Sequence, residues 1–166
     1  MQPISLGIAL ALKHEKKNSL VFSFLGDGAL GEGVVYEALN IASLWKLPVL
    51  YIVENNKYAQ STSIRENMAG SIKKRFESFN LNTVEIETND VEILIKNFEE
   101  LISNLRSGKG PACIIINTYR LSAHSKGDDD RDIGEIKFWK RFDPIRILKD
   151  RINSNEFNIF IFLEFN

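Results

Sequence analysis

The segment Leu20-Val21-Phe22-Ser23-Phe24-Leu25-Gly26-Asp27-Gly28 joins an apolar run to an acidic turn between glycines. Such a run, bounded by turn residues, is typical of a buried strand. A second run, Val49-Leu50-Tyr51-Ile52-Val53, ends just before Asn55-Asn56. If both strands lie close together in a parallel sheet, the Asp27 carboxylate and the Asn56 carboxamide converge at its carboxyl edge, where open α/β sheets bind ligands.

The residue types at this edge indicate which ligand it would hold. Carboxylate and amide oxygens are hard ligands of the kind that Mg²⁺ selects, and Mg²⁺ commonly completes its shell with phosphate oxygens and water. Gly26 and Gly28 let the backbone approach a diphosphate because no Cβ intervenes. The pattern therefore predicts a metal–diphosphate site. The alternatives are that Asp27 caps a helix and that Asn55 holds the turn.

The remainder of the chain alternates between strand-like and helix-like segments. This alternation predicts an α/β fold with a doubly wound, mainly parallel sheet. A polar loop at 59–71 is expected on the cofactor side, and a second long polar loop at 120–133. The expected elements, in chain order, are a helix at 4–14, a strand at 20–25, a helix at 33–45, a strand at 48–53, a helix near 71–79, a strand at 83–87, a helix at 89–105, a strand at 112–118, and short helices near 134–141 and 144–152.

One helix and one strand carry more detailed expectations. The helix at 33–45 is expected to place its apolar residues on one side, and these are Val34, Val35, Ala38, Leu39, Ala42 and Trp45. Cys113 lies in the apolar strand at 112–118 and is expected to be a small buried side chain.

Composition bounds the function without identifying it. The 166 residues are 44% apolar, which is enough for one α/β domain with a core. The net charge of −1 shows no excess of positive charge of the kind that binds nucleic acids or anionic membranes. One cysteine allows no internal disulfide, which suits a reducing compartment. We find no apolar run of membrane-spanning length and no signal peptide, and we expect a cytoplasmic, bacterial protein.

Together with its surroundings, the motif resembles a known family. Gly26-Asp27-Gly28, followed after one strand–helix–strand unit by Asn55-Asn56, is the thiamin diphosphate motif. The chain resembles the α subunit of 2-oxo acid dehydrogenase E1 components, the subunit type of pyruvate, branched-chain 2-oxo acid and acetoin dehydrogenases. The resemblance runs from about residue 2 to about residue 151. The further segments that carry it are Ala29–Gly33, Tyr36–Asn40, Leu44–Pro48, Glu54–Tyr58, Ser107–Pro111, Thr118–Arg120, His124-Ser125 with Asp128-Asp129, and Asp143–Ile145.

The resemblance implies a role for six residues. Asp27 and Asn56 would ligate Mg²⁺ through side-chain oxygens, and Tyr58 would ligate it through its backbone carbonyl. Gly28 and Ala29 would lie against the diphosphate with their N–H groups toward its oxygens. His124 would sit on the loop that closes over the cofactor and contact the diphosphate, although the family's paired histidines are here reduced to one.

The implied reaction is oxidative decarboxylation of a 2-oxo acid, followed by reductive acylation of a lipoyl group. The implied partners are an E1 β subunit, in an α₂β₂ heterotetramer, and a lipoyl-bearing E2 component. Because the family's active site lies between α and β subunits, we expect the isolated chain to be inactive. Two other hypotheses are the diphosphate-binding half of a transketolase-like enzyme and a non-catalytic truncated remnant.

Both ends of the chain differ from the family pattern. We expect the diphosphate-binding domain to span residues 1–152 and to be partial, because the family's α subunit has well over a hundred residues before this point. Residues 153–166 are rich in Phe, Ile and Asn and match no helix of the family. If left uncovered, that tail would expose an apolar patch.

Overall fold

The central element is a four-stranded parallel sheet with the strand order β1-β2-β6-β5. The computed structural model describes residues 1–125, 127 and 129–152, so the expected tail at 153–166 and the motif residue Asp128 lie outside the described residues. The strands are β1 (Val21–Gly26), β2 (Val49–Asn55), β5 (Asn82–Glu87) and β6 (Ala112–Asn117). The α/β fold with a parallel sheet is thereby confirmed, and β1 and β2 are neighbours, as the motif required.

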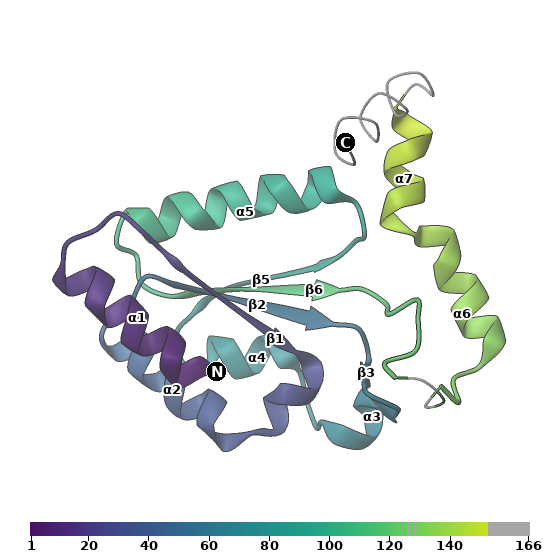
Figure 1. The fold of residues 1–166 in the computed structure, drawn as a ribbon. Helices are drawn as coiled ribbons and strands as arrows, with labels where there is room; N and C mark the ends of the chain where they lie inside the picture. Colours follow the sequence, from purple (N-terminus) through teal and green to yellow (C-terminus); the bar gives the residue numbers. More distant parts are fainter. Residues whose placement is uncertain (126, 128, 153–166) are drawn as a thin grey trace.

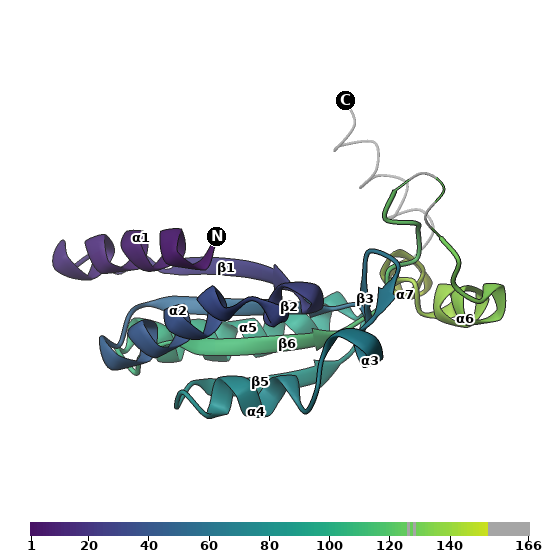
Figure 2. The same cartoon turned by 90° about the horizontal axis from the view of Figure 1, so that it is seen from below.

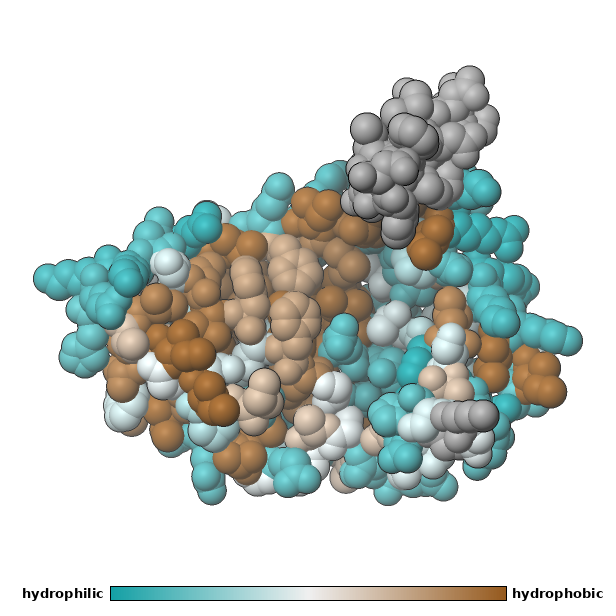
Figure 3. Space-filling view, viewed as in Figure 1, coloured by the Kyte–Doolittle hydropathy of each residue, from teal (hydrophilic) through white to brown (hydrophobic). Residues whose placement is uncertain are grey.

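Helices cover the two faces of the sheet unequally. Among the described helices, α1 (Gln2–His14), α2 (Gly33–Leu44) and α4 (Ile72–Glu77) cover one face, and α5 (Val91–Arg106) covers the other (Figure 1). Figure 2 shows the same sheet with α2 and α4 in front of it and α5 behind. Figure 3 shows an apolar surface between α5 and α1, where Phe22 and Phe24 of β1 are 46% and 61% exposed.

The core explains why the second apolar run has no polar alternation. Val49, Tyr51 and Val53 of β2 join the core under α1, α2 and α4, whereas Leu50 and Ile52 join the core under α5. A strand that is buried on both faces reads as a continuous hydrophobic run. Cys113 is fully buried in β6, and burial raises the pKa of its thiol.

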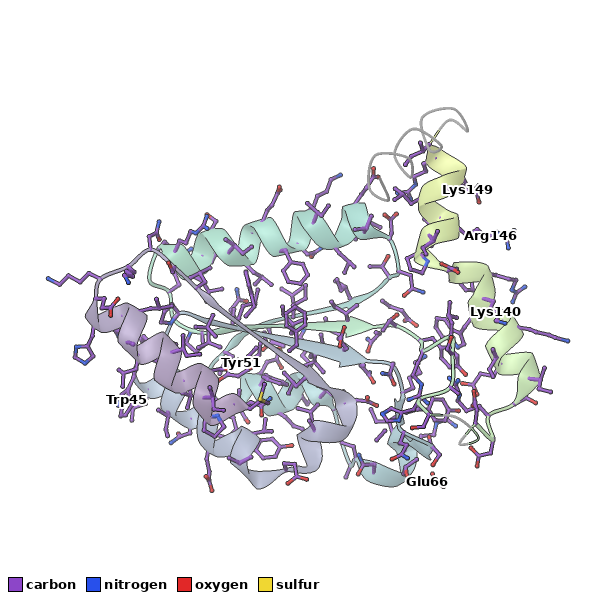
Figure 4. All side chains as sticks on the ribbon, in the orientation of Figure 1. Trp45, Tyr51, Glu66, Lys140, Arg146 and Lys149 are labelled. Carbon is purple, nitrogen blue, oxygen red and sulfur yellow. The ribbon has the colours of Figure 1, made fainter. Side chains whose placement is uncertain are left out.

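Three details of the sequence interpretation are wrong. The first apolar run is expected to form a buried strand, but Phe22 and Phe24 on one face of β1 are exposed, because the core under α5 is formed by β2 and β6. Val34 and Trp45 do not face the core with the other apolar residues of α2, and they are 40% and 47% exposed. A helix packed on one sheet buries only a limited stripe, and these two side chains lie outside it. Figure 4 places Trp45 near the end of α2. The segment 59–71 is not a plain loop, since it contains a β-hairpin and a helical turn: β3 (Tyr58–Ala59), β4 (Thr62–Ser63) and α3 (Ile64–Asn67).

The last described elements pack beyond the carboxyl edge of the sheet (Figure 1). They are α6 (Ile133–Trp139), the 3₁₀ turn η2 (Lys140–Phe142) and α7 (Pro144–Arg151). Arg151 pairs with Asp90, the N-cap of α5, and donates to Glu92 Oε2 at 2.9 Å, which ties the end of α7 to the start of α5. In the part of the chain that the structure describes, no helix combines the length and the apolar character needed to cross a membrane.

Candidate functional site

Asp27 is a buried carboxylate at the carboxyl edge of the sheet. It begins the 3₁₀ turn η1 (Asp27–Gly31) directly after β1, and it is only 2% exposed. Gly26 pairs in register with Glu54, so the carboxylate follows β1 at the level where β2 continues into Asn55 and Asn56. Among the described residues, Asp27 Oδ2 has no hydrogen-bond partner. A buried, unpaired carboxylate oxygen is costly, and it therefore requires an explanation.

The electrostatics of Asp27 combine one dominant effect with three opposing ones. Burial raises the pKa of the carboxyl, because desolvation penalises the charged form. The backbone N–H groups of Asp27 and Gly28 and the positive charge of Arg120 act in the opposite direction, without cancelling it. Arg120, in the segment after β6, therefore interacts electrostatically with the Asp27 carboxylate after β1.

Asn56 and Tyr58 form a turn beside this carboxylate. Asn56 Oδ1 accepts a hydrogen bond from the Tyr58 backbone N–H at 3.1 Å, which makes an Asx turn at the end of β2. The Tyr58 hydroxyl donates to Glu135 Oε2 at 2.9 Å, and burial together with this carboxylate raises the pKa of Tyr58 to about 12. The turn therefore has a fixed geometry before any ligand is considered.

The glycine at position 28 is required by packing. A Cβ built on Gly28 would lie 2.6 Å from the Ala59 Cβ, which is closer than side chains approach in folded proteins. η1 thus lies directly against β3 of the hairpin, and Ala29 packs partly buried against the main core. The structure gives a packing reason for Gly28 and leaves its expected diphosphate contact as a prediction.

Arg131 is the residue that fixes the loop carrying His124. Its guanidinium donates to Asp129 from Nε to Oδ1 at 2.6 Å and from Nη2 to Oδ2 at 2.7 Å, a bidentate pair. It also donates to the backbone carbonyls of Arg120 at 2.5 Å and Ser122 at 3.1 Å. The hydrogen bonds to Asp129 raise the pKa of Arg131 and lower that of Asp129. His124 is exposed on this loop, with Nδ1 2.9 Å from Ser125 Oγ.

Aromatic rings join the loop to the hairpin and to α6. The Arg131 guanidinium lies 5.5 Å from the Tyr58 ring centroid and 5.2 Å from that of Tyr119. Tyr119 stacks on Trp139 at 5.3 Å, and Lys57 Nζ lies 4.5 Å above the Trp139 ring. Arg120 Nη2 donates to the Gln60 carbonyl at 2.6 Å. These contacts hold three separate segments together beside Asp27.

A chain of side-chain hydrogen bonds crosses three neighbouring strands at the same edge. Asn55 Nδ2 donates to Asn117 Oδ1 at 2.6 Å, and Asn117 Nδ2 donates to Glu85 Oε1 at 3.0 Å. The Asn55 side chain is therefore bonded to β6, and its expected role in holding the turn stays a prediction.

The sequence interpretation missed Arg131, Glu135 and Asn117. Only Arg131 left a signal, because it is a single cation in the acidic run Asp128–Asp132. In the described part of the chain, no cluster of three or more histidine, cysteine, aspartate or glutamate side chains could hold a metal. Any cation at this edge would rely on Asp27 together with amide and backbone oxygens.

Comparison with known proteins gives a family for this geometry. The family model described as "Dehydrogenase E1 component" matches residues 1–158. This chain belongs to the dehydrogenase E1 component family. It is 36% identical over 158 residues to the pyruvate dehydrogenase E1 component subunit alpha of Rickettsia felis, covering 93% of this chain and 48% of the relative. The corresponding protein of Rhizobium meliloti is 37% identical over 155 residues, covering 91% of this chain and 44% of the relative. The chain spans about half the length of the curated relatives it matches.

Solved structures show the same fold at lower identity. Transketolase from Campylobacter jejuni matches with a TM-score of 0.61 and 24% identity, over 68% of this chain and 18% of that chain. A structure assigned to a thiamin diphosphate-dependent enzyme isolated from Mycobacterium smegmatis matches with a TM-score of 0.54 and 21% identity, over 72% of this chain and 22% of that chain. At these identities the likeness supports the fold alone.

Proposed function

We propose that this chain is the α-subunit portion of a 2-oxo acid dehydrogenase E1 component and holds Mg²⁺ and the diphosphate of thiamin diphosphate. The observation that carries the proposal is Asp27 Oδ2, a buried carboxylate oxygen without a partner among the described residues, at the ligand-binding edge of a parallel sheet. Membership of the dehydrogenase E1 component family supports the same assignment.

The residues at the edge fit a hard divalent cation. A cation next to Asp27 would satisfy Oδ2 and would offset the burial that raises its pKa. Asn56 Oδ1 accepts one hydrogen bond, from Tyr58 N–H, and an amide oxygen has a second lone pair available. These oxygens, with the Tyr58 carbonyl, are the ligand types that Mg²⁺ uses alongside phosphate and water.

Thiamin diphosphate, when bound, supplies the electron sink for decarboxylating a 2-oxo acid. This chain's own residues would bind and position. Gly28 allows η1 to pack directly against Ala59 of the hairpin, beside Asp27. Arg131 holds the carbonyls of Arg120 and Ser122 and so determines where the His124 loop leaves the fold. We propose that His124 contacts the diphosphate from this loop.

The substrate class and the partners are proposed from the family to which the chain belongs. The relatives are pyruvate dehydrogenase subunits, and we propose a 2-oxo acid substrate, with an E1 β subunit and a lipoyl-bearing E2 as partners in a bacterial cytoplasm. Because the chain spans about half of those relatives, we expect no turnover of a 2-oxo acid by the isolated chain. Substantial turnover by the purified chain alone would contradict this expectation.

The decisive experiment is a calorimetric titration of the full chain with thiamin diphosphate, with Mg²⁺ and with a chelator. We expect binding only with Mg²⁺, and its loss in Asp27→Ala because the variant lacks the buried carboxylate. The matched control is Asp150→Ala, which removes an exposed aspartate of α7 and should bind as the parent does. A folded chain that shows no Mg²⁺-dependent binding would favour the non-catalytic alternative.

A further inference from the structure

The amino edge of the sheet, opposite the candidate site, carries three adjoining surface hollows. Their volumes are about 370, 500 and 460 Å³, and Lys46 lines all three. Lysine and arginine side chains line them from the ends of three helices, and none of the described residues that line them is acidic. The basic residues are Lys13, Lys16, Lys17, Lys46, Arg106 and Lys109. We call this surface the basic edge.

Helix ends alone do not account for so much positive charge. The helices α1, α2 and α5 all end here, and each C-terminus carries about half a negative charge, or roughly −1.5 in total. Within the described part of the chain, one ion pair lies at this edge, between Lys17 and Glu15 at 2.5 Å. Among the described residues, the side chains of Lys16, Lys46 and Arg106 have no hydrogen-bond or ion-pair partner. Cations therefore remain in excess of the groups that they could neutralise.

Two of these lysines occupy backbone positions that disfavour a side chain. Lys16 has a φ of 54° and Lys46 a φ of 47°, each directly after a helix C-cap. The following N–H groups return to the helix, from Lys17 to the Leu12 carbonyl at 3.0 Å and from Leu47 to the Ala42 carbonyl at 2.9 Å. Glycine usually fills this position, since a side chain there costs free energy. The same unfavourable choice at two neighbouring helix ends points to a use for the charge.

Apolar side chains lie next to the charges. Leu44 is 73% exposed and Trp45 is 47% exposed, and both line the hollow that Lys13, Lys16 and Lys46 also line. Figure 4 shows Trp45 near the α1 end of the molecule, far from Lys140 and Arg146 at the other end. An exposed tryptophan among cations is the composition of a protein-binding surface, where an aromatic anchor supplies affinity and charge supplies steering.

We propose that the basic edge docks an acidic protein segment that carries apolar anchor side chains. Charge complementarity selects the acidic segment, and Leu44 with Trp45 selects its apolar residues. Three connected hollows along helix ends suit an extended chain better than one small anion. The proposal is independent of the cofactor site, because that site lies at the opposite edge of the sheet.

The test is fluorescence anisotropy of the full chain with a labelled peptide of alternating glutamate and leucine. We expect binding that weakens as salt is raised, since exposed charges are screened. Combined Lys16→Glu, Lys46→Glu and Arg106→Glu should weaken it roughly tenfold or more, and Trp45→Ser by roughly tenfold. The matched control reverses three exposed cations at the other end, Lys137, Lys140 and Arg146, and should leave the affinity unchanged.

Each alternative result overturns a specific part of the proposal. Equal losses in the control variant would mean that the attraction is non-specific. Competition by inorganic triphosphate as effective as that by unlabelled peptide would mean a small-anion site. Unchanged affinity in Trp45→Ser would remove the apolar anchor. The Asp27→Ala variant should bind the peptide normally, so failure of the cofactor proposal would not affect this one. Glutamine at positions 16, 46 and 106 gives a second variant if charge reversal prevents folding.

Discussion

The two edges of the sheet carry polar residues of opposite kinds. At the carboxyl edge, polar groups are buried and held in place: Arg131 is 8% exposed and donates to two backbone carbonyls and one carboxylate. At the amino edge, the cations are exposed, and Lys16, Lys46 and Arg106 have no hydrogen-bond or ion-pair partner among the described residues. At the carboxyl edge the polar groups hold the backbone in place, whereas at the amino edge they are exposed to solvent.

This difference indicates two modes of recognition on one domain. Buried, hydrogen-bonded groups hold atoms within tenths of an ångström, which suits the binding of a metal and a cofactor. Exposed charges act over about a Debye length and accept many geometries, which suits the capture of a flexible partner. Substituting chemically equivalent residues at the two edges tests whether the edges differ in this way.

Replacing an arginine at each edge should give the largest difference in the free energy of unfolding. Arg131→Ala breaks a buried ion pair and leaves two carbonyls without their donor, so we expect the free energy of unfolding to fall by roughly 3 kcal/mol. Arg106→Ala, at the amino edge, should change it by less than about 0.5 kcal/mol. Urea denaturation measures both. Equal effects would mean that Arg131 is not the fixed point of the His124 loop.

Replacing a glycine by alanine should give the next largest change in stability. The new methyl group of Gly28→Ala would meet the Ala59 Cβ at 2.6 Å, and relieving that overlap should cost roughly 1–3 kcal/mol. Gly7→Ala is the control, because a Cβ there meets nothing within 4 Å and alanine favours the α1 helix by up to about 1 kcal/mol. Melting temperatures that move in the same direction for both would contradict this packing argument.

Sequence patterns predicted the sheet and the position of the candidate site for a clear reason. The strands β2 and β6 are buried on both faces and leave continuous apolar runs. The expected and observed strands of the parallel sheet differ by at most two residues at either end. Parallel neighbours end at the same edge, which is why residues following β1 and β2 could be expected to lie side by side. The metal and diphosphate contacts themselves stay predictions.

The parts that could not be predicted depend on contacts without periodicity. The hairpin of β3 and β4 has strands of two residues each, too short for an alternating pattern. Arg131 acts on backbone carbonyls, which every residue possesses, so no side-chain spacing marks its partners. The prediction for Trp45 was wrong because helical periodicity does not determine how wide the buried stripe of a helix is.

Titration of Asp27 should change the free energy of unfolding less, because two backbone N–H groups and Arg120 oppose the effect of burial on its pKa. A carboxyl whose pKa is raised in the folded state binds its proton more tightly when folded. Without Mg²⁺, the parent chain should therefore lose stability as the pH rises from the ordinary aspartate pKa of 3.8 through the raised value. Asp27→Asn should lack this loss. Denaturation of both proteins across that pH range measures it, and parallel curves would contradict a burial-raised pKa.

The smallest effect concerns the lysines with positive φ at the amino edge. Lys16→Gly should stabilise the chain by about 1 kcal/mol, because glycine adopts φ 54° without steric cost. Lys16→Gln is the control, since it removes the charge but keeps the Cβ, and it should give no such gain. Thermal denaturation compares the two variants. If the basic edge binds an acidic segment, Lys16→Gly would gain stability and lose peptide affinity together. A residue kept at the expense of stability and needed for binding is what separates a functional charge from one that only neutralises a helix end.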